Sequence, residues 1–158
     1  MRLTFAFYKA KGTWVNKLIR WRTQSKYSHV EVILPDGNWF SMGTRWQDGF
    51  RARFKHINPT PGHWDYIDVD VHPGALGQAE AFAAFIVGAK YDWAEIFFTH
   101  LIPLGIDLNG RYTCSAVCNH FGTIAHVPEL YSTQPHKTDP GEIFNNLVVS
   151  AQYQFREG

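Results

Sequence analysis

The segment Ser28-His29-Val30-Glu31-Val32-Ile33-Leu34 decides the fold, because its side chains alternate strictly between two sets. A strand places successive side chains on opposite faces, so Val30, Val32 and Leu34 share one face and His29 and Glu31 share the other. The next residues, 35–38 (PDGN), predict a tight turn, since glycine supplies the positive φ that such a turn needs. The pattern therefore predicts a hairpin with a histidine and a glutamate on one face.

The other elements follow from the same kinds of pattern. They predict strands over 3–8, 28–34, 38–42, 51–57, 64–71 and 148–155, and helices over 14–21, 75–89, 93–101, 114–125 and 140–147. Thr13, Thr113 and Asp139 stand where N-caps are expected, and the Ala- and Phe-rich helix 75–89 is expected to be buried. Because the strands cluster in residues 1–71 and the helices in 72–147, the order favours an α+β fold.

The composition indicates a compact globular chain. It has 158 residues, of which 45% are apolar and 18% charged, against a usual charged share of about 25%. That balance excludes disorder and a nucleic-acid-binding tail, and two cysteines exclude a disulfide framework. We expect a single domain over residues 1–158, with no signal peptide and no transmembrane segment. As synthesised it is expected in the reducing cytoplasm.

Basic residues concentrate at the N-terminal end. Residues 1–60 carry eleven basic and three acidic side chains, whereas residues 61–158 carry four and eleven. The run from Lys9 to Lys26 holds six bases and no acid. It is either a solvated helix face or a docking surface for an anionic polymer or a membrane. In the second interpretation Lys17, Arg20 and Trp14 are the candidate substrate-binding residues.

A cysteine and a histidine stand in positions that suit nucleophilic catalysis. Cys114 falls in the first turn of the helix predicted after Thr113, where free N–H groups and the helix dipole favour a thiolate. An imidazole such as that of His29 facing this thiol would act as its base. Cys118, one turn later, is expected to be a small buried hydrophobic residue.

Two other kinds of site compete with the catalytic interpretation: a zinc site and a nucleotide-binding site. Cys114, Cys118, His120 and His126 are the candidate zinc set, but the chain has no Cys-x-x-Cys knuckle. The glycines form neither nucleotide-binding pattern. We therefore predict no metal site and no cofactor.

Several short motifs resemble the permuted branch of the NlpC-like, papain-fold cysteine peptidases, which has bacterial and phage members and distant relatives of lecithin retinol acyltransferase. They cover about residues 5–147 and are YKAKGTW (8–14), LIRW (18–21), YSHVE (27–31), DG (48–49), WD (64–65), KYDW (90–93) and YTCS (112–115). In this branch the histidine strand precedes the cysteine helix, as His29 precedes Cys114 here. The resemblance implies a circularly permuted papain-like fold.

The resemblance also implies roles for individual residues. Cys114 matches the nucleophile and His29 the base, and the position that orients the imidazole matches Ser41. Glu31 faces the same side as His29 but lies about 6.7 Å along the strand, so we expect it more to line the site than to hold the ring. In the hydrolase interpretation, the catalytic residues are Cys114 and His29, with His29 oriented by Ser41 or Glu31. Ala116 stands where the family often has Glu.

Two functions of different classes follow from these residues. The first is a cysteine hydrolase that acts through an acyl-enzyme on an amide, ester or thioester, with cell-wall peptides and acyl lipids as candidate substrates. The second is a non-catalytic phage or bacterial structural or binding module, which keeps the fold without the reaction. One form of this hypothesis places the protein in a virion. The retention of His29 and Cys114 favours the enzyme, and Ala116 favours the module.

Overall fold

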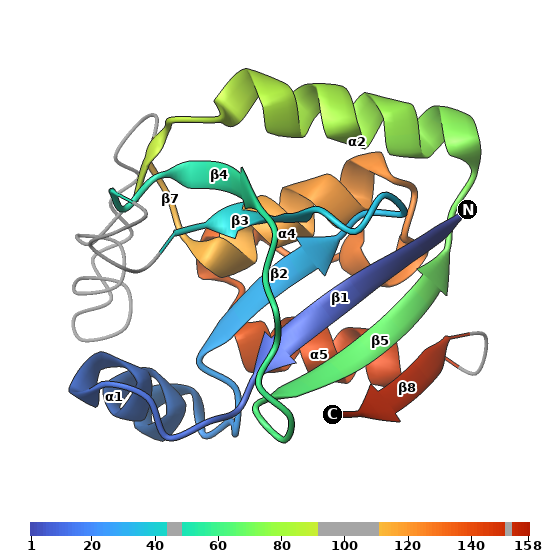
Figure 1. Ribbon diagram of the computed structural model, residues 1–158. Coiled ribbons are helices and arrows are strands. Elements are labelled where there is room, and N and C mark those ends of the chain that lie inside the picture. Colours follow the sequence, from blue (N-terminus) through green and yellow to red (C-terminus); the bar gives the residue numbers. More distant parts are fainter. Residues whose placement is uncertain (44–48, 92–110, 151–152) are drawn as a thin grey trace.

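The computed structural model describes residues 1–43, 49–91, 111–150 and 153–158, which form a sheet with helices packed against it (Figure 1). Within these ranges the main sheet has six antiparallel strands in the order β4-β3-β2-β1-β5-β8. The strands are β1 (Arg2–Tyr8), β2 (His29–Ile33), β3 (Trp39–Met42), β4 (Ala52–Lys55), β5 (Trp64–Asp70) and β8 (Gln154–Glu157). The predicted α+β class is confirmed.

Helices pack against one face of this sheet. Figure 1 shows α4 and α5 behind the strands, α2 along the top and α1 beyond the end of β1. Their bounds are α1 (Trp14–Thr23), α2 (Pro73–Ile86), α4 (Cys114–Ile124) and α5 (Pro140–Val148), with short 3₁₀ turns at Pro128–Leu130 and Pro135–Lys137. No helix within the described ranges combines the length and the apolar character that crossing a bilayer requires.

The alternation of the strands separates two apolar clusters. Phe5, Val30 and Val32 face the helices and belong to the main core, together with residues of α2, α4 and α5. Trp39 and Trp64 belong to a smaller cluster on the other face. Because His29 and Glu31 alternate with Val30 and Val32, the sheet directs them away from the main core.

Capping side chains begin two of the helices as predicted. Thr113 accepts a hydrogen bond from the N–H of Ala116 at 3.2 Å, and Asp139 accepts one from the N–H of Glu142 at 2.9 Å. Thr13 precedes α1 but does not cap it through its side chain. The preference for Ser, Thr and Asp at N-cap positions therefore predicted all three helix starts, although Thr13 makes no side-chain hydrogen bond to α1.

Two predictions about elements were wrong, and one lies outside the described residues. The helix predicted as buried is α2, which buries only one stripe and leaves Phe85 87% exposed, because it covers the core from one side. The strand predicted over 148–155 begins only at Gln154, where the chain meets Asp68 of β5, and Val148 still belongs to α5. The helix predicted over 93–101 falls in the undescribed range.

A short parallel pair connects the start of α4 to the edge of the main sheet. β6 (Lys90–Tyr91) pairs with β7 (Arg111–Tyr112), and a bridge between Arg51 and Lys90 joins β6 to the residue before β4. The N–H of Ala52 also donates to the carbonyl of Ala89 at 2.9 Å. Since α4 begins two residues after β7, this pairing helps to fix the position of Cys114.

Asp65 of β5 is a fully buried carboxylate that joins three segments. It accepts hydrogen bonds from Lys9 at 2.6 Å and from the Tyr27 hydroxyl at 2.7 Å, and it pairs with Lys26 at 2.9 Å. Burial raises the pKa of Asp65, but these three donors more than offset that effect and hold the pKa below its ordinary value. Because Tyr27 lies two residues before His29, this anchor fixes the entry to β2.

Replacing Asp65 with Asn should lower the free energy of unfolding by about 2–3 kcal/mol at neutral pH, because charge-assisted hydrogen bonds are lost. A carboxylate whose pKa folding lowers stabilises the protein above its unfolded pKa of about 3.9, and this contribution disappears as the pH falls through the folded value. Urea denaturation should therefore show the deficit shrinking below about pH 4. Asp70→Asn, exposed on the same strand, is the control. A deficit of equal size at neutral and strongly acidic pH would contradict this prediction.

Candidate active site

Cys114 is the first residue of α4, as its sequence position predicted. The first-turn N–H groups of a helix have no intrahelical partner and carry partial positive charge, which favours a thiolate. The side chain is 4% exposed. The helix start therefore supplies the electrostatic setting that a cysteine nucleophile needs.

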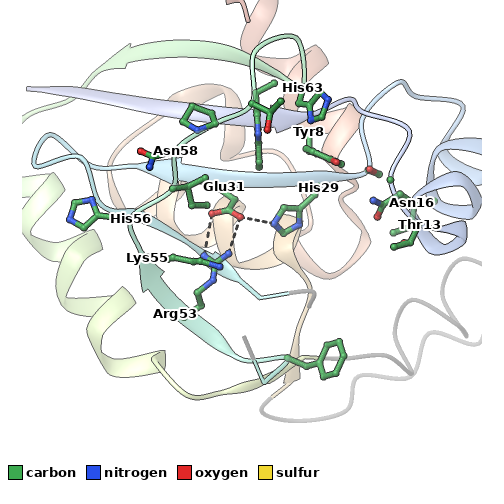
Figure 2. Close-up of a pocket in the computed structure, with 18 of the residues that line it drawn as sticks. Tyr8, Thr13, Asn16, His29, Glu31, Arg53, Lys55, His56, Asn58 and His63 are labelled. Carbon is green, nitrogen blue, oxygen red and sulfur yellow. Dashed lines mark hydrogen bonds and ion pairs between the residues drawn. The ribbon is translucent and has the colours of Figure 1, made fainter. Parts of the chain in front are cut away.

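His29 is the first residue of β2, and a glutamate two residues later holds its ring. Nε2 of His29 lies 3.0 Å from Oε1 of Glu31. Glu31 in turn accepts two hydrogen bonds from the guanidinium of Arg53, at 3.0 Å on Oε1 and 3.2 Å on Oε2. Figure 2 shows these contacts as a row that runs from His29 through Glu31 to Arg53. The imidazole is thus oriented by a carboxylate that is itself fixed.

The charges of this row act on Cys114. Burial lowers the pKa of His29, but charge attraction and hydrogen bonding from Cys114 and Glu31 raise it to about 10. Burial raises the pKa of Cys114, but His29 and the N–H groups of Val30 and Ser115 more than offset this and lower it below its ordinary value. Both directions favour a thiolate paired with an imidazolium.

The surroundings of Glu31 also favour its charged form. Burial raises its pKa, but His29 and Arg53 more than offset this, so its pKa lies below the ordinary value. Nδ1 of His29 is buried and has no hydrogen-bond partner of good geometry among the described residues. With Nε2 held by Glu31, Nδ1 is the ring nitrogen left for proton transfer.

The sequence-based expectation for Glu31 was wrong, and Ser41 occupies a different place. Two residues on one strand face are far apart at the backbone, but the long glutamate side chain spans the gap to the ring. Ser41 of β3 donates to the carbonyl of Val30 at 2.7 Å and accepts a weak contact from Cys118 at 3.7 Å. Glu31 is therefore the residue that orients the imidazole.

Arg53 was missed by the sequence reasoning. Its strand was predicted, and alternation within β4 places it on one face, but the pairing of that strand was not known. In the structure Arg53 lies opposite Ser41, and Ser41 lies on β3 beside β2. A basic residue in a strand next to a histidine strand was the signal available.

Cys118 is a buried apolar residue, as predicted. It is fully buried, and this burial raises its pKa well above the ordinary value. The charge of the nearby Cys114 is the second cause of the rise. The sulfur lies 3.5 Å from the carbonyl of Val30. Two thiols one helical turn apart therefore have opposite ionisation tendencies.

A pocket of about 660 Å³ lies over His29 and Glu31. Figure 2 shows His56 and Asn58 towards one end of it and Thr13 and Asn16 towards the other. Trp14 lines the pocket while its side chain is 74% exposed.

The two basic residues predicted to bind substrate, Lys17 and Arg20, are not among the described residues that line the pocket. Lys17 is exposed on α1, apart from the residues that line the pocket in the described structure. Arg20 donates to the carbonyls of Lys9 at 3.2 Å, Lys11 at 2.7 Å and Ala10. It therefore holds the loop between β1 and α1.

The four candidate zinc ligands are not placed together as a metal-binding group. His120 packs on Phe82 with ring centroids 6.0 Å apart, and His126 follows the end of α4. In the part of the chain that the structure describes, no group of three or more His, Cys, Asp or Glu side chains is placed to hold a metal ion.

Comparison of the chain with protein-family models, with curated proteins and with solved structures found no match. The chemistry of the site therefore rests on its own geometry.

Replacing Glu31 with Gln should raise the pH at which Cys114 becomes reactive by about 1–2 units, because a charged hydrogen bond worth about 1.5–3 kcal/mol no longer stabilises the imidazolium. The rate of iodoacetamide alkylation of Cys114, followed by mass spectrometry across pH, measures the shift. Ser41→Ala is the matched variant, since it removes a buried hydroxyl beside the same strand and should leave the midpoint unchanged. A larger shift in Ser41→Ala than in Glu31→Gln would restore Ser41 as the orienting residue.

Proposed function

We propose that the protein is a cysteine hydrolase, a peptidase or amidase or an acyl-ester or thioester hydrolase, with a permuted papain-like fold. The observation that carries the proposal is the placement of Cys114 at a helix start beside an imidazole held by Glu31 and Arg53. The chain order, with the base on β2 and the nucleophile on the later α4, supports the permuted arrangement.

The reaction would begin with the thiolate of Cys114 attacking a carbonyl carbon. A carbon–sulfur bond forms, the π electrons move to the oxygen, and N–H groups at the start of α4 stabilise the oxyanion. As the tetrahedral intermediate collapses, the bond to the leaving group breaks and the leaving group takes a proton from Nδ1 of His29. The product of this half is a thioester with the enzyme.

Water completes the cycle in the second half. His29, now neutral, accepts a proton from the attacking water, and the carbon–sulfur bond breaks to return the thiolate. Glu31 keeps the ring oriented throughout and compensates its positive charge whenever His29 is protonated. Both halves use only the chain's own side chains and water, and both a cell-wall peptide and an acyl lipid would supply a suitable carbonyl.

One observation favours the second candidate function, a non-catalytic binding module. Cys114 is 4% exposed and does not appear among the described residues that line the pocket. Ala116, which favours the module because the family often has Glu at this position, is fully buried, and its N–H donates to the Thr113 cap of α4.

Thiol labelling distinguishes the enzyme from the module. At about pH 6, iodoacetamide should alkylate Cys114 and leave Cys118 unmodified until the protein unfolds, because only the first thiol is held as a thiolate. His29→Ala should move the reactivity of Cys114 towards the ordinary thiol pKa of about 8.5. Peptide mapping by mass spectrometry reads both sites in one sample, so Cys118 is the internal control. Slow labelling of both thiols that ignores His29→Ala would leave the binding module as the function.

The exposed basic residues beside the pocket support a second, separable property: contact with an anionic polymer or membrane surface. Lys11, Lys17 and Trp14 are exposed at the end of the molecule where α1 lies. Lys9 and Lys26 are paired with Asp65, and Arg20 binds the preceding loop, so these three have structural contacts. The docking surface is therefore smaller than the sequence suggested.

Binding to vesicles that contain anionic lipid should weaken steeply between low and physiological salt. Charge reversal at Lys11 and Lys17 together should abolish this binding with little change in thermal stability, and Lys137→Glu, exposed elsewhere, is the control. Arg20→Glu should lower the melting temperature, since it removes hydrogen bonds to the loop. Co-sedimentation measures the binding. Equal binding by the double variant and the wild type would assign the basic run to solvation alone.

A further inference from the structure

The outer face of α1, formed by Trp14, Leu18 and Trp21, carries two exposed indole rings. Figure 1 shows this helix beyond the end of β1. Trp14 is 74% exposed and Trp21 is 73% exposed, whereas Leu18 between them is half-buried. The two tryptophans stand two helical turns apart, about 10.5 Å along the axis, so both side chains leave the helix on the same side. Single exposed apolar residues are common, but a contiguous apolar stripe marks an interaction surface.

Lysines flank this outer face without an acidic partner. At about 100° per residue, Lys17 is about 40° around the helix from Trp21, and Lys11 lies in the loop just before the helix. Both lysines are exposed, and neither forms an ion pair with an acid of the described ranges. The sequence also has no acid between residues 9 and 26. A positive potential therefore surrounds the apolar stripe, and it favours an anionic partner.

A bilayer that contains anionic lipid fits this combination better than a soluble polymer or a protein. The indole ring is enriched at membrane interfaces, where its apolar body leaves water and its N–H stays near polar groups. A lysine close to such a surface strengthens binding about fivefold through lipid phosphates. A soluble polymer supplies the charge but has no apolar layer for the rings, and protein interfaces are depleted in lysine. Tryptophan and leucine on one side, with lysine beside them, are typical of helices that lie on membranes.

We propose that the outer face of α1 binds the surface of an anionic bilayer, with the indoles of Trp14 and Trp21 inserted below the headgroups and with Lys11 and Lys17 at the lipid phosphates. This inference rests on the docking property proposed above, for which charge alone suffices, and it adds an apolar contact that a polymer does not offer. Because Trp14 also lines the pocket, together with Asn16 of the same helix, binding brings this end of the pocket to the headgroups.

Co-sedimentation with vesicles of equal parts phosphatidylglycerol and phosphatidylcholine tests the apolar contact. Trp21→Ala should weaken binding about tenfold, because part of the large apolar area of an indole no longer leaves water, and Trp14→Ala/Trp21→Ala should weaken it further. Phe85→Ala is the matched control, since it removes an equally exposed ring from α2, and it should bind as the wild type does. All three variants should melt within a few degrees of the wild type, because the replaced rings are exposed.

Insertion is measured separately by tryptophan fluorescence on vesicles whose lipids are brominated in their acyl chains. Quenching should be seen in the wild type and in Phe85→Ala, and it should be lost in Trp14→Ala/Trp21→Ala. Dextran sulfate serves as the soluble anionic polymer. Any binding to it should be equal in the wild type and the double tryptophan variant, because the polymer contacts only the charges.

The inference is overturned if the double tryptophan variant binds vesicles as the wild type does, or if brominated lipid leaves the bound wild type unquenched. Either result keeps the electrostatic docking. Binding to dextran sulfate without binding to vesicles also overturns the inference, and it assigns the basic residues to a polymer. Failure to bind either probe refutes the docking property together with the inference. The thiol labelling that tests the hydrolase is independent of all these outcomes.

Discussion

The carboxylate of Glu31 is the interaction on which the rest of the site depends. It is almost fully buried, and it is shared between an imidazole on its own strand and a guanidinium on another. A buried charge is tolerated only when it is paired and hydrogen-bonded, and here each member of the row satisfies the next. Loss of the carboxylate would remove both of its hydrogen bonds to Arg53 and its contact with the ring. Together with Cys114, the same group therefore raises the pKa of His29, and it also holds the guanidinium of Arg53.

The row also requires a small residue beneath it. Arg53 of β4 reaches Glu31 of β2 across β3, and the residue opposite Arg53 on β3 is Ser41. The Ser41 hydroxyl turns to the carbonyl of Val30, just beyond the paired residues that join β2 and β3. Ser41 thus hydrogen-bonds the backbone of β2 from the position that pairs with Arg53.

Local patterns predicted more of the fold than of the site. Strand alternation over 28–34 and the caps at Thr113 and Asp139 depend on neighbouring residues, so the elements and the location of Cys114 could be inferred from the sequence. The contact between Glu31 and Arg53 depends on the pairing of β2, β3 and β4, which the sequence does not encode locally. The reach of Glu31 to His29 was misjudged because backbone spacing was used in place of side-chain length. The contacts of Arg20 and Lys9 could not be inferred from local patterns either, since their partners lie in the loop before α1 and on β5.

The order of strands has a consequence for how the protein folds. β2, β3 and β4 are consecutive hairpin-connected strands, so the contacts that join His29, Glu31 and Arg53 close short loops. Cys114 meets them only after a much longer stretch of chain has been placed. Because loop closure costs more entropy as the separation grows, the meander is expected to form first and α4 to dock onto it later. During synthesis from the N-terminus, the base and its supporting charges would therefore be assembled before the nucleophile exists, so the thiol enters an environment that is already electrostatically prepared.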